Sequence, residues 1–81
     1  MKVTPITPNR TEVELSDGTC ILFSYSTPVA ALVPGRGWIR TSTKHSPTTT
    51  RHINRWLFDN LGRNHCVPFV TQEEMNELVN I

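Results

Sequence analysis

In the first half of the chain hydrophobic and polar residues alternate, which is typical of β-strands that bury one face. Residues 11–16 and residues 19–25 are two such stretches, and Asp17 and Gly18 lie between them. The Asp-Gly pair favours a tight hairpin turn, because both central positions of that turn need positive φ. The pattern therefore predicts an antiparallel hairpin with a two-residue loop.

The loop length determines which residues of this hairpin face each other. A two-residue loop places Leu15 opposite Cys20 and Val13 opposite Leu22, so these four side chains are predicted to form one apolar face. The other face carries a second apolar group, which the terminal helix, a second copy of the chain or a partner would have to cover. This secondary surface consists of Ile21, Phe23 and Tyr25.

Two further strands are predicted on the C-terminal side of the hairpin. Residues 29–33 have the composition of a strand, residues 34–37 that of a tight turn, and residues 38–41 that of another strand. Residues 1–8 contain prolines, which have no backbone N–H to donate. This first segment is therefore predicted to be an edge strand at most.

The second half of the chain has helical spacing instead. Ser46 followed by Pro47 is a favourable N-cap and first helical residue. Hydrophobic residues then recur at helical spacing up to Gly62, which is a favourable residue to end a helix. These signals predict a helix over residues 47–61, although the many Ser and Thr residues at 41–50 would also suit a flexible linker.

A shorter helix is predicted at the C-terminus. Thr71 followed by Glu74 is a capping-box pattern, which predicts a helix over residues 72–80, and residues 66–70 favour an extended segment before it. The predicted fold class is α+β in a single domain over residues 1–81. It is a small antiparallel meander of three to four strands packed against one helix, with a short C-terminal helix. The predicted core consists of Val13, Leu15, Cys20, Leu22, Ile53, Trp56 and Leu57.

The charged residues are distributed unevenly, although the formal net charge is only +1. Residues 18–58 contain no Asp or Glu, whereas residues 59–81 are acidic. The molecule is therefore predicted to be polarised, with a basic middle part. The basic residues of that part are Arg36, Arg40, Lys44, Arg51 and Arg55.

One face of the predicted helix is a candidate binding surface, because Arg51, Arg55 and Phe58 fall opposite its apolar stripe. Guanidinium groups beside an aromatic ring bind phosphates and stack on bases, and the same residue types anchor protein partners. A solvated face, with Phe58 packed beneath the C-terminal segment, is the third interpretation. The full candidate set for binding a partner or nucleic acid is Arg51, Arg55, Phe58, Lys44, Arg40 and Arg36.

The remaining reactive side chains form no recognisable active site. Neither Cys-x-x-Cys nor His-x-x-x-His spacing occurs, so no metal site is predicted, and Cys20 is interpreted as a buried thiol. His65 and Cys66 are adjacent, and adjacent residues of an extended segment point to opposite sides. Residues 34–37 lack the lysine and the following helix of a phosphate-binding loop. The chain is therefore predicted not to be an enzyme and to need no cofactor.

Length and hydropathy further limit the domain size and the cellular location that the sequence predicts. A chain of 81 residues forms one domain with a small core, which leaves little material for a deep enclosed pocket. The sequence lacks the apolar stretch of a secretion signal and any apolar run long enough to span a membrane. These features predict a cytoplasmic protein with reduced thiols and no membrane partner.

Four strings between residues 11 and 57 share their order and spacing with a protein family. They are Asp17-Gly-Thr, Leu22-Phe-Ser-Tyr-x-Thr-Pro-Val-Ala-Ala31, Arg40-Thr and Lys44-x-Ser-x-Thr-Thr-x-Arg-His-Ile-Asn-x-Trp-Leu57. Through them the chain resembles a family of short bacteriophage proteins of unknown function. The resemblance implies no catalytic residue. It implies an accessory protein in the cytoplasm of the host bacterium, with a role in host takeover or anti-defence, including anti-CRISPR activity.

Three functions follow, in order of preference. The first is a small non-enzymatic phage-type accessory protein that binds and modulates a host protein or protein complex. The second is a nucleic-acid-binding protein that uses the basic region from Arg36 to Arg55. The third is a structural or self-assembling phage component, such as a homodimer. Salt distinguishes the first two, because binding through phosphates weakens steeply as salt rises, whereas an apolar interface barely responds.

Overall fold

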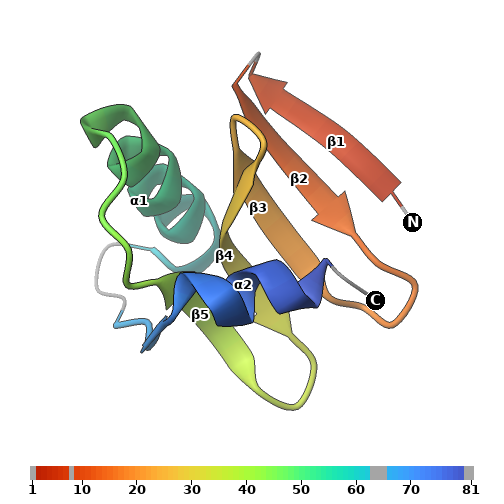
Figure 1. Ribbon diagram of the computed structural model, residues 1–81. Helices are drawn as coiled ribbons and strands as arrows, with labels where there is room; N and C mark the ends of the chain where they lie inside the picture. The colour runs from red at the N-terminus through yellow and green to blue at the C-terminus, as the bar shows by residue number, and fades with distance from the viewer. Residues whose placement is uncertain (1, 8, 63–65, 80–81) are drawn as a thin grey trace.

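Within residues 2–7, 9–62 and 66–79, which the computed structural model describes, six strands form one sheet with a helix on each face (Figure 1). The strands are β1 (Lys2–Thr7), β2 (Arg10–Glu14), β3 (Cys20–Ser24), β4 (Thr27–Val33), β5 (Gly37–Thr41) and β6 (Phe69–Val70). The helices are α1 (Pro47–Leu61) and α2 (Gln72–Leu78). Neither helix is long and apolar enough to cross a membrane.

The sheet is mixed, and its strands follow one another in space in the same order as along the chain. Neighbours from β1 to β5 are antiparallel, whereas β6 is parallel to β5. α1 is the connection that carries the chain from β5 to β6, as parallel neighbours require. The predicted fold class, a meander of three to four strands on one main helix, is therefore wrong. β6 has only two residues, and its pairing depends on α1 returning the chain to β5, which no local pattern shows.

The hairpin between β2 and β3 forms where the sequence predicts it, but its loop has three residues. The Leu15 carbonyl accepts from the N–H of Gly18 at 3.1 Å, and the Leu15 N–H donates to the Thr19 carbonyl at 2.7 Å. Gly18 has a φ of 94°, as the last residue of a three-residue loop with a bulge requires. The Thr19 N–H also donates to the Asp17 carboxylate at 2.9 Å. This extra bond holds the longer turn.

The third loop residue shifts the register of the hairpin by one. Val13 faces Ile21, and Glu12 faces Leu22. A shift of one residue turns a strand's side chains to the opposite face, so the predicted common face of Val13, Leu15 and Leu22 is wrong. Leu15 packs with Ile21 on the face covered by α2, whereas Leu22 lies on the face covered by α1.

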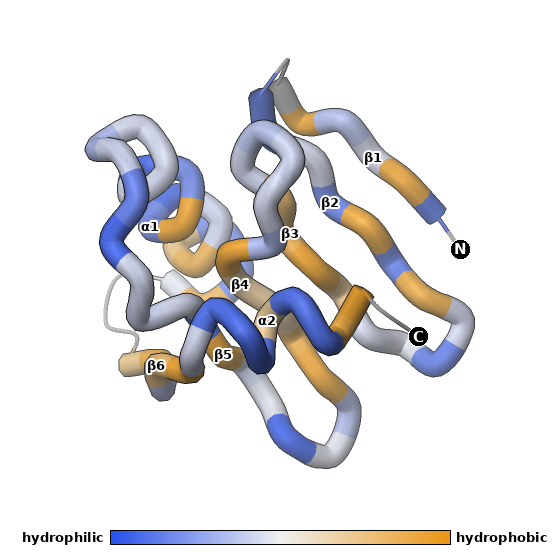
Figure 2. The backbone as a smooth tube through the Cα atoms, in the orientation of Figure 1, coloured by the Kyte–Doolittle hydropathy of each residue, from blue (hydrophilic) through white to orange (hydrophobic). Residues whose placement is uncertain are grey.

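The hydrophobic core has two halves, one on each face of the sheet. The half beneath α1 contains Leu22, Val29, Ala30, Ile53, Trp56, Leu57 and Val67. The half beneath α2 contains Ile21, Ala31, Ile39, Val70 and Met75. Since β3 and β4 are covered on both sides, their hydrophobic residues run continuously (Figure 2). The predicted joint burial of Leu22 with the three apolar residues of α1 is confirmed.

The first helix has the predicted bounds and caps. The Ser46 hydroxyl accepts from the Thr49 N–H at 3.2 Å, and Pro47 is the first helical residue. At the other end the Gly62 N–H donates to the Phe58 carbonyl at 2.8 Å. The prediction of a helix over residues 47–61 is confirmed, and the alternative of a flexible linker fails from Pro47 onward.

The second helix begins as predicted. The Thr71 hydroxyl accepts from the Glu74 N–H at 3.2 Å, which satisfies one of the free donors at the start of the helix. α2 ends at Leu78, and the predicted end at residue 80 lies outside the described residues. Met75 is fully buried against the sheet. This contact explains why such a short helix is stable in its place.

Candidate anion-binding site

Two of the predicted basic residues are neutralised by carboxylates from outside the basic region. Arg36, in the turn between β4 and β5, lies 2.9 Å from the carboxylate of Glu74 in α2. Arg55 lies 3.2 Å from Asp59, one turn further along α1. Exposed ion pairs of this kind add little stability. They do reduce the positive charge that these two arginines present to a ligand.

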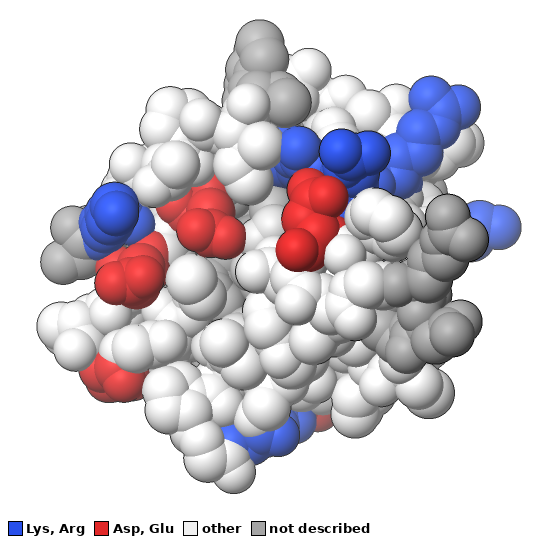
Figure 3. Space-filling view, turned by 180° about the vertical axis from the view of Figure 1, so that it is seen from behind, with Lys and Arg blue, Asp and Glu red and all other residues white. Residues whose placement is uncertain are grey.

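The other three predicted basic residues have no carboxylate partner within the described part of the chain. Arg51 is exposed on the outer side of α1, and Arg40 and Lys44 line a cavity on the α1 side of the sheet. Seen from behind, positive side chains gather where α1 lies, with an acidic group beneath them (Figure 3). The structure therefore brings Arg40 and Lys44 together at a cavity that Arg36, Arg51 and Arg55 do not line.

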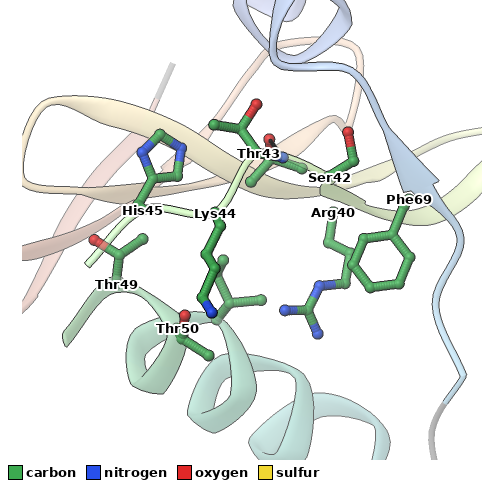
Figure 4. Close-up of a pocket in the computed structure, with 10 residues that line it drawn as sticks. Arg40, Ser42, Thr43, Lys44, His45, Thr49, Thr50 and Phe69 are labelled. Atoms are coloured by element: carbon green, nitrogen blue, oxygen red, sulfur yellow. Dashed lines mark hydrogen bonds between the residues drawn. The ribbon is translucent and has the colours of Figure 1, made fainter. Parts of the chain in front are cut away.

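The cavity lies where the end of β5, residues 42–46, the first half of α1 and β6 meet. Its volume is about 220 Å³. The side chains of Arg40 and Lys44 both extend toward α1, and the Phe69 ring lies beside Arg40 (Figure 4). Hydroxyl groups make up much of the wall, and none of the described carboxylate side chains belongs to it. The lining residues are Arg40, Thr41, Ser42, Thr43, Lys44, His45, Thr49, Thr50, Ile53 and Phe69.

Arg40 is held in a fixed position at this cavity. It pairs with Phe69 across β5 and β6, and its guanidinium carbon lies 4.9 Å from the centre of the Phe69 ring. Its Nη1 donates to Asn54 Oδ1 at 3.3 Å, whereas its buried Nε has no hydrogen-bond partner among the described residues. Burial lowers the pKa of Arg40, but a guanidinium stays charged in proteins. Arg40 is thus a fixed cation that has no carboxylate partner among the described residues.

The loop that carries Lys44 is fastened to α2 by Gln72. The Gln72 amide nitrogen donates to the Pro28 carbonyl at 2.8 Å, so its Oε1 is the atom that faces the loop. This oxygen accepts from the Thr41 hydroxyl at 2.8 Å and lies 3.0 Å from His45 Nε2. Because an amide oxygen only accepts, His45 Nε2 must carry the proton. These hydrogen bonds tie Thr41 and His45, on either side of residues 42–44, to α2.

A serine–histidine pair lies elsewhere, between β3 and α1. Ser24 Oγ is 2.8 Å from His52 Nδ1 and 3.0 Å from Thr49 Oγ1. Ser24 is only 2% exposed, so its hydroxyl is closed to a substrate and serves to join strand and helix. Burial and the charge of Arg10 lower the pKa of His52. The pair is a buried polar contact and not a nucleophile with its base.

Phe58 and the predicted secondary surface differ in exposure. Phe58 is 43% exposed, with the Arg55 guanidinium 6.0 Å from its ring centre. Ile21 is fully buried and Phe23 half-buried, both in the core beneath α2. Tyr25 is exposed in a turn on the other side, with its ring 6.1 Å from that of His52 in α1. These three side chains therefore do not form one exposed surface, because α2 covers the first two.

The two cysteines are free thiols in different surroundings. Cys20 is half-buried rather than fully buried, and burial, together with the charges of Glu12 and Glu14, raises its pKa. Cys66 is exposed, and its neighbour His65 lies outside the described residues. Among the residues that the structure describes, no three His, Cys, Asp or Glu side chains are arranged to hold a metal ion.

Sequence reasoning missed Phe69 and did not foresee that Asn54 contacts Arg40. Phe69 was expected only in an extended segment, because its neighbour Arg40 is far away in sequence and the parallel pairing was not foreseen. Asn54, which holds Arg40, had no local signal as a contact of β5. The Ser and Thr residues at 41–50 were a usable signal, since several of them line the cavity.

Comparison with known proteins places the chain in a family. The model of a family described as a family of unknown function (DUF8033) matches residues 1–77. Since the match covers nearly the whole chain, the chain belongs to this family. No curated protein and no solved structure matches it. The expected membership of a family of unknown function is confirmed, and the expected phage origin stays a prediction.

Proposed function

We propose that this member of a family of unknown function is a non-enzymatic binding protein whose ligand is nucleic acid. Its binding surface comprises the cavity of Arg40 and Lys44, the neighbouring Phe69 ring and the outer side of α1 at Arg51. This choice reverses the order of preference drawn from the sequence. The reason is the arrangement of charge around the cavity.

The observation that carries the proposal is that some basic residues form ion pairs with carboxylates and others do not. Arg36 and Arg55 have carboxylate partners, whereas Arg40, Lys44 and Arg51 have none in the described chain. Two of these three line one cavity that also presents hydroxyl groups and lacks carboxylates. Unpaired cations, hydroxyls and backbone N–H groups are the groups with which proteins hold phosphates. An exposed aromatic ring beside them suits a base.

Salt-dependent binding tests the proposal. Fluorescence anisotropy of a labelled oligonucleotide, measured over a series of KCl concentrations, should give an association constant that falls linearly with salt on logarithmic axes. Each phosphate contact contributes a slope of about 0.7 to 0.9. The double variant Arg40→Gln/Lys44→Gln should bind more weakly and with a shallower slope.

A charge-matched control separates this site from general attraction. Arg36→Gln/Arg55→Gln removes the same charge from residues that are already paired, so it should change affinity and slope much less. Lys44→Gln alone serves as a milder variant, because Lys44 is exposed and its loss should not disturb folding. Equal losses in the two double variants, or no binding by the parent at low salt, would overturn the proposal.

A protein partner is the second candidate. Phe58 and Phe69 are 43% and 64% exposed, and exposed aromatics beside arginine are typical centres of protein interfaces. Under this proposal the chain is a phage-type accessory protein that binds and modulates a host protein in the host cytoplasm. Its complex should survive nuclease and high salt in a pull-down from host lysate. Loss of the captured protein on nuclease treatment would count against it.

A further inference from the structure

We infer that the cavity receives one phosphate of a single-stranded nucleic acid while a neighbouring base stacks on Phe69. This inference rests on the proposed function and names its ligand class. Duplex ends and stems would then be poor ligands. The size of the cavity, the position of its two cations and the exposure of one aromatic ring support this inference.

The cavity is too small for a nucleotide but large enough for a phosphate. Its volume is about 220 Å³, whereas sites that enclose whole small molecules span roughly 300–1,000 Å³. A phosphate group with bridging waters, at about 30 Å³ per water, fits the smaller space. A base joined to that phosphate must therefore lie outside the cavity.

The two cations reach the cavity from adjoining segments, Arg40 from β5 and Lys44 from the loop after it (Figure 4). The Arg40 guanidinium is already held by Asn54 and by the Phe69 ring, and a planar guanidinium binds phosphate oxygens through two parallel hydrogen bonds. The hydroxyl of Thr50 lies in the facing wall on α1. That hydroxyl donates to the Ser46 carbonyl at 3.4 Å, so a phosphate between the two cations would take its hydrogen bonds from Arg40 and Lys44.

Phe69 is the nearest place for the base. It is 64% exposed, the largest value among the exposed hydrophobic side chains of the described chain. The Arg40 guanidinium lies over its ring, 4.9 Å from the ring centre, so a base would stack on the part of the ring that Arg40 does not cover. Because Phe69 and Arg40 are paired neighbours in β6 and β5, a base on this ring is adjacent to a phosphate at Arg40.

This geometry distinguishes single strands from duplexes. In a duplex the bases are stacked on one another and their faces are closed to a protein side chain. A single strand offers every base for stacking, and proteins that bind single strands pair such rings with basic grooves. Removing a stacking ring weakens binding by about 5- to 150-fold per base. Arg40 keeps its hydrogen bond to Asn54 when the Phe69 ring is removed, so the number of phosphate contacts, and hence the salt slope, should stay the same.

The test compares oligothymidine with a duplex of equal length in one anisotropy assay, using the full chain. We expect tighter binding of the single strand. Phe69→Ala should lose single-strand affinity by about 5- to 150-fold with the same salt slope, and Phe69→Tyr should restore it. Phe58→Ala is the matched control, since Phe58 is also exposed but does not contact Arg40, and it should bind like the parent.

The outcomes separate this inference from the proposed function. If neither the single strand nor the duplex binds the parent at low salt, both the proposed function and the inference fail. If the duplex binds as tightly as the single strand, the inference alone fails. It also fails if Phe69→Ala binds oligothymidine like the parent. Thermal melts followed by circular dichroism confirm that each variant is folded, and the parent's own preference for single strands tests the inference without any substitution.

Discussion

Trp56 joins the core beneath α1 to a polar contact in β2, so its replacement tests the packing of the fold. Its ring is 3% exposed and meets the Trp38 ring edge-on, with 5.3 Å between the ring centres. Its indole N–H donates to Glu12 Oε1 at 2.7 Å. Trp56→Ala removes both contacts, whereas Trp56→Phe keeps an aromatic ring and removes the hydrogen bond.

The magnitudes follow from these contacts. Truncation of a buried Trp to Ala costs about 3–5 kcal/mol, while a domain of this length has roughly 4–12 kcal/mol of total stability. Trp56→Ala should therefore unfold much of the protein at room temperature. A hydrogen bond to a charged group contributes about 1.5–3 kcal/mol, so Trp56→Phe should lose about 2–4 kcal/mol. Glu12→Gln keeps an acceptor oxygen and should cost about 1 kcal/mol or less.

Urea unfolding followed by far-UV circular dichroism measures these differences, and the remaining Trp38 provides a second, fluorescent probe. The double variant Trp56→Phe/Glu12→Gln completes a cycle. Since residues in contact show coupling energies of about 0.5–3 kcal/mol, the two losses should not add. Additive losses would mean that the negative charge of Glu12 adds nothing to its hydrogen bond with Trp56. A Trp56→Ala protein with the parent's unfolding midpoint would refute the burial of this side chain.

Two further predictions concern titrating groups. Burial and the charge of Arg10 lower the pKa of His52 from its ordinary 6.5. As the pH falls, the unfolded chain therefore binds the His52 proton at a higher pH than the folded chain does. The free energy of unfolding should then fall as the pH drops below 6.5. His52→Asn should reduce this dependence in urea titrations at several pH values, and an unchanged dependence would contradict the assignment. Cys66 should react with a thiol reagent faster than Cys20, whose pKa is raised. Equal rates in the two single Cys→Ser variants would contradict that order.

Much of the secondary structure could be predicted because its signals are local. Ser46 with Pro47 marks the start of α1, and Thr71 marks the start of α2. The hairpin register could not be predicted, since an Asp-Gly pair suits both two- and three-residue loops. The bond from the Thr19 N–H to Asp17, which accompanies the longer loop, is visible only in the structure. The third residue of the loop shifts the register by one, which places the apolar side chains of β2 on the other face of the sheet.

The residue types of the candidate site could be predicted from the sequence. Which of the basic residues would belong to it could not. The absence of Asp and Glu over residues 18–58 drew attention to the basic side chains. Which of them remain unpaired depends on distant carboxylates, because Glu74 reaches Arg36 only through the packing of α2 near the β4–β5 turn. The cavity itself depends on β6, whose position is fixed by its pairing with β5. Local sequence patterns carry no information on such contacts.

The most direct test of the central claim is to map where a single strand touches the protein. Titration of oligothymidine into the ¹⁵N-labelled chain, followed through its backbone amide resonances by NMR, requires no substitution. The largest shifts should fall at residues 40–45, residues 49–54 and residues 69–70, which surround the cavity. Amides of β1 and β2 should barely move. Shifts concentrated in β1 and β2, with the residues around the cavity unaffected, would contradict the assignment of this site.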